Sequence, residues 1–140
     1  QANRFSVNFG SEGGGGERRV LLWKAGVDMF LQNPFFGGNT TTTFGYVHNI
    51  FIEVMHSMGM IGTLLFSFLL FRVFKTIYLL LKYKHRMAWV GFLFIQHFIG
   101  SLLSGNIYSS DYFWYLFVIL LSIGSKLSKK YAKTGDLRDA

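Results

Sequence analysis

IFIEVMHSMGMIGTLLFSFLLF, residues 50–71, is a continuous apolar run in which Glu53 and His56 are the only ionisable side chains. An apolar run of about 20 residues matches the roughly 30 Å hydrocarbon core of a lipid bilayer. We therefore predict that 50–71 forms a transmembrane helix. A register shifted to 58–81 would place an arginine and a lysine near the bilayer centre, at a cost of about 2.5 to 3.5 kcal/mol each on insertion scales.

Two further apolar runs follow. Residues 87–103 contain no Asp, Glu, Lys or Arg, with His97 near their middle, and residues 108–125 begin with an aromatic cluster typical of a membrane interface. Aromatic residues make up 19% of the 140-residue chain and charged residues only 15%, which is unusual for a soluble domain. We therefore predict an all-α integral membrane protein with three transmembrane helices in a C-terminal membrane region, 50–140.

The positive charges favour one orientation in the membrane. Lys and Arg concentrate at 82–86 and after the third run, whereas 104–111 contains neither. Because cytoplasmic loops carry the excess of Lys and Arg, we predict that 82–86 and the basic tail are cytoplasmic and that 1–49 and 104–111 are extracytoplasmic. This distribution accounts for the net charge of +7 without a nucleic-acid partner. The absence of cysteine excludes disulfides and thiolate metal sites within this sequence.

The N-terminal region is expected to contain one helix that lies in the membrane interface. Four consecutive glycines at 13–16 predict a flexible link. The next stretch, 17–32, is amphipathic and too short to span, and it should end before Pro34. Its apolar positions are Val20, Trp23, Val27, Phe30 and Leu31. No signal peptide is visible, and we expect the chain to be a piece of a longer protein.

Arg18 and Arg19 lie in the first turn of this predicted helix, where cations oppose the helix dipole. One interpretation is that they bind an anion such as a phosphate or diphosphate headgroup, for which guanidinium offers bidentate donors. The alternative is a solvated helix in which Arg19 rests on Trp23 as a cation–π pair.

His48 and Asn49 stand directly before the first apolar run. Histidine changes charge near physiological pH, which suits a general base. Asn is among the best N-cap residues, so the pair could also serve only to begin the helix. Both roles are compatible, because a cap at Asn49 would orient His48 toward the preceding loop.

Glu53 and His56 form a Glu-x-x-His sequence, whose spacing lets both side chains reach one metal ion. The sequence has no second copy of this motif, so we expect no metal site. Glu53 should instead be hydrogen-bonded in a polar pocket or paired with an arginine of the interfacial helix. An ionisable residue inside a span is a functional candidate, which applies to His97, although a hydrogen bond to a neighbouring carbonyl is the alternative.

Taken in order, these pieces resemble the O-antigen ligase and O-antigen polymerase superfamily of bacterial membrane glycosyltransferases. The resemblance covers about residues 17–71, through ERRVLLWKAGVDMFLQNPFFGG and YVHNIFIEVMHSMGMIGTLLF. Its parts are an Arg four residues before a Trp, an Asn-Pro turn that ends in Gly, a His-Asn pair that opens a span, and Gly-x-x-Gly inside that span. In this sequence the Arg and Trp are Arg19 and Trp23, and the turn is 33–37. The His-Asn pair is His48 and Asn49, and the two glycines inside the span are Gly59 and Gly62. Residues 37–39 read Gly-Gly-Asn, where the family often has a fuller Gly-x-Gly turn.

The resemblance implies a multi-span fold of the GT-C type, of which this chain would be the last three spans and the large outer loop. It implies inverting transfer of a glycan from undecaprenyl diphosphate to an acceptor sugar, on lipid A core or a growing polysaccharide, at the outer face of the bacterial cytoplasmic membrane. No metal ion or other cofactor is implied. His48 would be the base, Arg19 a diphosphate ligand and Arg18 its neighbour. Supporting roles would fall to Asn49, Glu53 and His56.

Two other functions remain open from the sequence. A transporter or flippase for lipid-linked sugars would use His97 and Glu53 to line its path, and a non-catalytic fragment would only pack a larger assembly. Ligase, polymerase and protein-glycosylating activities are equally compatible with the residues quoted. We expect the 140 residues alone to be inactive, because the resemblance implies that part of the site lies elsewhere.

Overall fold

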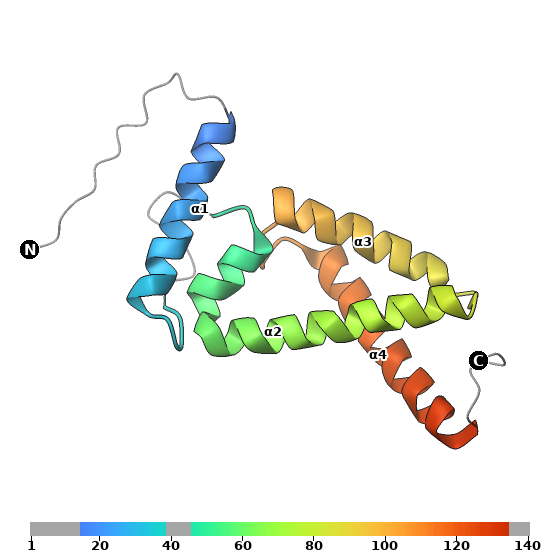
Figure 1. Ribbon diagram of the computed structural model, residues 1–140. Helices are drawn as coiled ribbons and strands as arrows, with labels where there is room; N and C mark the ends of the chain where they lie inside the picture. The colour runs from blue at the N-terminus through green and yellow to red at the C-terminus, as the bar shows by residue number, and fades with distance from the viewer. Residues whose placement is uncertain (1–14, 39–45, 135–140) are drawn as a thin grey trace, which may run out of the picture.

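The computed structural model describes residues 15–38 and 46–134, which form four α-helices and no strand (Figure 1). The helices are α1 (Gly15–Gln32), α2 (Ile50–Lys82), α3 (Ala88–Leu103) and α4 (Asp111–Thr134). The prediction of an all-α chain is confirmed over these ranges.

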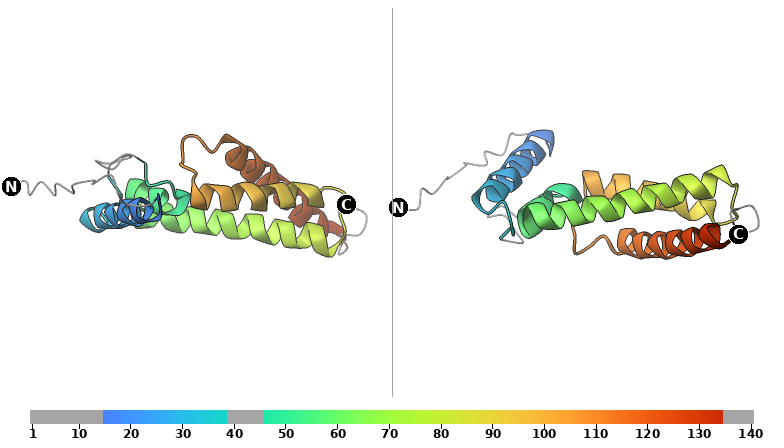
Figure 2. Two further views of the ribbon diagram at one scale, coloured as in Figure 1. Left: turned by 90° about the horizontal axis from the view of Figure 1, so that it is seen from above. Right: turned by 60° about the horizontal axis from the view of Figure 1, so that its bottom comes forward.

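The longest helix, α2, organises the molecule. The chain turns after α2 so that α3 runs back along it, and α4 crosses both helices and contacts each of them (Figures 1 and 2). At the opposite end, α1 lies against the beginning of α2, which is its only contact among the four described helices. The predicted outer-loop helix and the predicted His-Asn helix start are therefore neighbours in space.

The core where α2, α3 and α4 meet is built from aromatic rings. Phe66 of α2, Phe94 of α3, and Phe113 and Phe117 of α4 are all buried. The ring centroids of Phe94 and Phe113 are 5.4 Å apart, and those of Phe66 and Phe117 are 6.1 Å apart. Such pairs contribute about 0.5 to 1.5 kcal/mol each beyond the burial of their area. The buried phenylalanines thus hold the three helices together.

A kink at Gly59 divides α2 into two segments. The backbone of Gly59 has φ 64° and ψ −165°, a conformation that glycine adopts readily and that strains any residue with a Cβ. The kink interrupts the regular helical hydrogen bonds, so the N–H of Met60 donates to the carbonyl of Pro34 at 2.7 Å. The carbonyl of His56, the usual acceptor for Met60, accepts instead from the N–H of Gly38 at 3.0 Å.

The turn that follows α1 supplies these replacement hydrogen bonds. It closes on itself through the N–H of Gly37, which donates to the carbonyl of Asn33 at 3.0 Å, and Gly37 has a positive φ of 71°. A Cβ at Gly59 would collide with the backbone of Gly37, and the reverse also holds. Figure 1 shows the turn against the bend of α2. The Asn-Pro turn and the Gly-x-x-Gly sequence are therefore two halves of one contact.

The observed α2 is longer than the predicted span. It begins at Ile50 as expected and continues past residue 71 to Lys82, so the helix extends beyond the stretch that is predicted to lie in the membrane. Arg72 and Lys75 lie on exposed positions of the helix and do not end it, because the backbone hydrogen bonds continue regardless of side-chain charge. At about 1.5 Å per residue, its 33 residues measure about 50 Å along the kinked helix axis, which is more than the roughly 30 Å of a hydrocarbon core.

Among the described residues, α2 is the one helix long and apolar enough to cross a membrane, and α3 is a shorter apolar helix. The three-span topology stays a prediction. The start of α3 agrees with the sequence within one residue, whereas α4 begins at Asp111 and leaves Tyr108 in the preceding turn. The helix α1 ends at Gln32 as Pro34 predicts, but it begins at Gly15, so part of the predicted glycine link is helical.

Candidate functional site

His48 precedes α2 in a left-handed backbone conformation with φ 57°. Residues other than glycine rarely adopt this conformation, although Asn, Asp and His do so more often than most, and it costs about 1 to 3 kcal/mol where it persists. The preceding residue, Val47, is fully buried, whereas the side chain of His48 is exposed. The imidazole is therefore presented outward from a backbone that is fixed on both sides.

Asn49 fixes the other side. Its Oδ1 accepts hydrogen bonds from the N–H groups of Phe51 at 3.0 Å and Ile52 at 3.1 Å, which is an N-cap and confirms the predicted helix start. Its Nδ2 also donates to the carbonyl of Leu102 at 3.0 Å, near the end of α3. One side chain thus joins the beginning of α2 to the end of α3.

Glu53 lies one turn into α2 and is 2% exposed. Its Oε2 accepts a hydrogen bond of 2.8 Å from the N–H of Ile107, in the loop between α3 and α4. The carbonyl of Ile107 in turn accepts from Nε1 of Trp114 at 2.8 Å. Of the two environments predicted for Glu53, the structure shows the polar pocket, and this pocket holds the α3–α4 loop beside the start of α2.

His56 is also 2% exposed and lies where α2 approaches α1 most closely. A Cβ added at Gly26 of α1 would come within 2.7 Å of Cγ2 of Ile52 and 3.5 Å of Cδ2 of His56. Glycine at this position therefore lets the two helices touch. Among the described residues, no group of three or more His, Cys, Asp or Glu side chains is arranged to hold a metal ion.

Arg18 and Arg19 are exposed in the first turns of α1. They precede Leu22, which is 5% exposed, and Gly26, which makes the close contact with α2. Arg19 is two turns before Gly26, which is about 10 Å along the helix axis. The structure thus brings the arginines and His48 to the same end of the molecule, with no direct contact between Arg19 and His48.

The predicted apolar positions of α1 differ in their exposure. Val20, Val27 and Leu31 are exposed, by 61%, 38% and 66%, while Trp23 and Phe30 are half-buried. Leu22 is buried, and Gly26 makes the close contact with α2. The exposed apolar residues remain available to a membrane interface, which is the environment predicted for this helix.

His97 belongs to a different environment. Its ring stacks on that of Tyr112 with centroids 5.5 Å apart, and its carbonyl accepts a hydrogen bond of 2.8 Å from Oγ of Ser101. His97 and Tyr112 both line a cavity of about 230 Å³ between the end of α3 and the start of α4. His97 thus contributes to α3–α4 packing and lies outside the group formed by Asn49 and Glu53.

Two features of this end of the molecule were not predicted from the sequence. One is the close contact at Gly26, and the other is the loop at Ile107 that binds Glu53. Gly26 could have been noticed as a glycine inside an amphipathic helix, which often marks a close approach. Nothing in the local sequence points from Glu53 to Ile107. The chain matches no protein-family model, no curated protein and no solved structure.

Proposed function

We propose that this chain carries part of the active site of a metal-independent, inverting membrane glycosyltransferase that moves a glycan from an undecaprenyl diphosphate carrier to an acceptor sugar. The observation that supports it best is the joining of four separate motif pieces around one helix junction. The Asn-Pro turn meets the kink at Gly59, α1 touches α2 at Gly26, and Asn49 caps α2 directly after His48.

In the proposed reaction, the acceptor hydroxyl attacks the anomeric carbon of the donor and the bond from that carbon to the diphosphate oxygen breaks. The bonding electrons leave with the diphosphate, and the hydroxyl proton passes to the imidazole of His48. A positioned base of this kind contributes about 10² to 10⁴ in rate. The exposed ring and fixed backbone of His48 suit this role, because a base must reach its substrate in a defined orientation.

Arg19, with Arg18 beside it, would bind the diphosphate, on which negative charge increases as the bond breaks. The α1–α2 contact at Gly26 holds the helix that carries the arginines beside the start of α2, which His48 precedes. Glu53 and Asn49 would act as positioning residues, since their hydrogen bonds fix the helix start and the α3–α4 loop. His56 would support them from the α1–α2 contact.

The proposal places the protein in the bacterial cytoplasmic membrane, with α1 and His48 at the outer face and three spans from α2, α3 and α4. The support is the apolar character of α2 together with the distribution of Lys and Arg. The donor is a lipid-linked glycan, and the acceptor is a sugar of lipid A core or of a growing polysaccharide.

The test measures glycan transfer from an undecaprenyl diphosphate donor by membranes that contain the whole protein, at matched expression. His48→Ala should lower transfer by about a hundredfold or more. His97→Ala is the matched control, because it removes a histidine from α3 and should leave most of the activity. A transporter would show the reverse dependence, and unchanged transfer in His48→Ala would refute the proposed base.

A further inference from the structure

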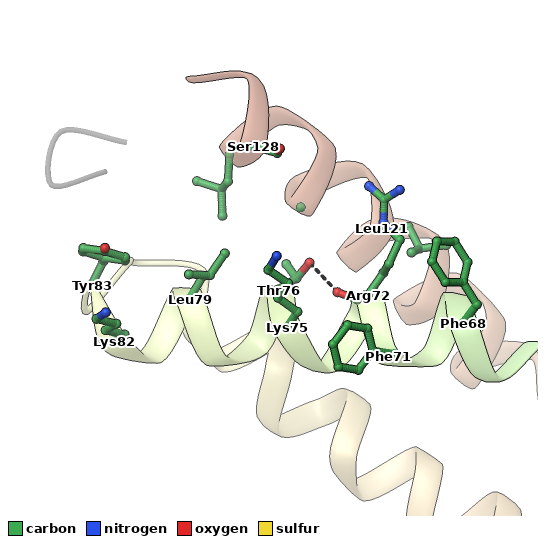
Figure 3. A pocket seen from close by; sticks show the side chains of 12 residues that line it. Phe68, Phe71, Arg72, Lys75, Thr76, Leu79, Lys82, Tyr83, Leu121 and Ser128 are labelled. Carbon is green, nitrogen blue, oxygen red and sulfur yellow. Dashed lines mark hydrogen bonds between the residues drawn. The ribbon is translucent and has the colours of Figure 1, made fainter. Parts of the chain in front are cut away.

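A groove between the second half of α2 and α4 carries positive charge over an apolar floor (Figure 3). Its volume is about 650 Å³, the largest of the cavities described. Arg72, Lys75 and Lys82 contribute the cations, all from α2. Figure 3 shows the side chain of Arg72 extended from α2 toward α4. The groove lies at the opposite end of α2 from His48, so it is separate from the proposed transfer site.

The lining of this groove has the two parts of a phospholipid site. Phe68, Phe71 and Leu121 form an apolar wall at one end, and the cations follow along α2 toward its C-terminus. Phe68 and Phe71 are 56% and 67% exposed, so their side chains are available to an acyl chain. At the far end, Nζ of Lys82 lies 5.5 Å from the centre of the Tyr83 ring. An aromatic ring beside a lysine is typical of the headgroup region of a membrane.

The charged side chains that line the groove are all positive. No acidic residue lines it, and the only Asp or Glu side chains in the described parts of α2, α3 and α4 are Glu53 and Asp111. Both are in first turns, at the opposite ends of α2 and α4 from the groove. Lys126 and Lys129 are exposed on the adjoining part of α4. Among the described side chains of α2, α3 and α4, an anionic group in the groove would therefore have only cations as charged neighbours.

We propose that this groove binds one anionic glycerophospholipid of the cytoplasmic leaflet, with its phosphate at Arg72 and Lys75 and an acyl chain along Phe68 and Phe71. Basic pockets between transmembrane helices on the cytoplasmic side are suited to such headgroups. The inference rests on the membrane placement given above, but not on the transferase chemistry. The lipid fills the space between α2 and α4 and fixes their crossing.

The experiment is native mass spectrometry of the whole protein in detergent, titrated with phosphatidylglycerol or with phosphatidylcholine. The wild type should retain one phosphatidylglycerol and little phosphatidylcholine. Arg72→Gln with Lys75→Gln should weaken phosphatidylglycerol binding by about ten- to thirtyfold, from roughly 1 kcal/mol per cation near a membrane surface. Lys84→Gln with Arg86→Gln removes the same charge outside the groove lining and should have little effect.

A steric variant separates a defined site from general charge attraction. Ser128→Trp, at an exposed residue of the groove lining, leaves every cation in place but fills the groove. It should weaken phosphatidylglycerol retention at least as strongly as the double charge variant does. Equal binding of the two lipids, equal loss in both charge variants, or full retention in Ser128→Trp would each overturn the proposal. His48→Ala should bind phosphatidylglycerol normally, so failure of the transferase proposal would leave this result unchanged.

Discussion

Met60 donates its backbone N–H to the carbonyl oxygen of Pro34 at 2.7 Å, although the two residues belong to different elements and the regular acceptor for Met60 would be His56. The turn after α1 thereby replaces helical hydrogen bonds that α2 loses at its kink. The position of α1, and with it the proposed diphosphate ligands, depends on this exchange. The kink is for this reason a part of the proposed site and more than a bend in a long helix.

The first prediction concerns Gly59. Gly59→Ala should destabilise the protein by about 1 to 3 kcal/mol or more, because alanine is strained at φ 64° and its Cβ would meet the backbone of Phe35 and Gly37. Thermal unfolding in detergent measures the change. The matched control is Gly100→Ala in α3, where a Cβ meets nothing within 4 Å.

That control should gain stability, since alanine is favoured over glycine by about 1 kcal/mol inside a helix. Equal unfolding temperatures for the two variants would contradict the role given to the Gly59 kink.

The second prediction concerns the hydrogen bond from Ile107 to Glu53. Glu53→Leu removes the acceptor and leaves a part-buried N–H without its partner, which should cost about 1 to 3 kcal/mol. Glu53→Gln retains a side-chain oxygen and should cost less. Hydrogen exchange followed by mass spectrometry should show loss of protection at 104–110 in the leucine variant. Unaltered exchange there would mean that Trp114 alone holds the loop.

The third prediction separates the two roles of Asn49. Asn49→Asp keeps an oxygen for the N–H groups of Phe51 and Ile52 but loses the donor to the carbonyl of Leu102. Asn49→Ala loses both and should cost about 0.5 to 2 kcal/mol for the cap, with a further loss for the contact to α3. The unfolding temperature should be highest for the wild type, lower for Asn49→Asp and lowest for Asn49→Ala. If Asp and Ala were equally unstable, the link to α3 would outweigh the cap.

The residues that could be predicted from the sequence are those whose structure depends on near neighbours. Asn49 was expected to cap α2 because its partners are two and three residues away, and the end of α1 follows from the restriction that Pro34 imposes. The full length of α2 does not follow from the apolar run, because such a run indicates where side chains prefer lipid, whereas a helix continues as long as its backbone hydrogen bonds do.

The remaining features depend on contacts between distant residues. In the sequence, Gly59 is one of several small residues in an apolar run. Its close approach to Gly37 and Phe35 is seen only in the structure. The partner of Glu53 is 54 positions away, so spacing within α2 gives no indication of it. The candidate arginines and histidine were named from their own sequence contexts. The contacts of α1 and its following turn with α2, at Gly26 and Gly59, bring them to one end of the molecule.

The last prediction uses the backbone of His48 to separate structure from chemistry. Glycine populates the left-handed region freely, so His48→Gly should leave stability unchanged or slightly raised while it removes the imidazole. Glycan transfer should nevertheless fall by about a hundredfold or more, as expected for loss of a base. Lys84→Gly is the control, because Lys84 is the other described non-glycine residue with a positive φ, at 50°, and it lies at the opposite end of α2. It should affect stability in the same direction without affecting transfer. A stable His48→Gly protein with full activity would show that His48 only shapes the approach to the Asn49 cap, and the proposed base would have to be sought elsewhere.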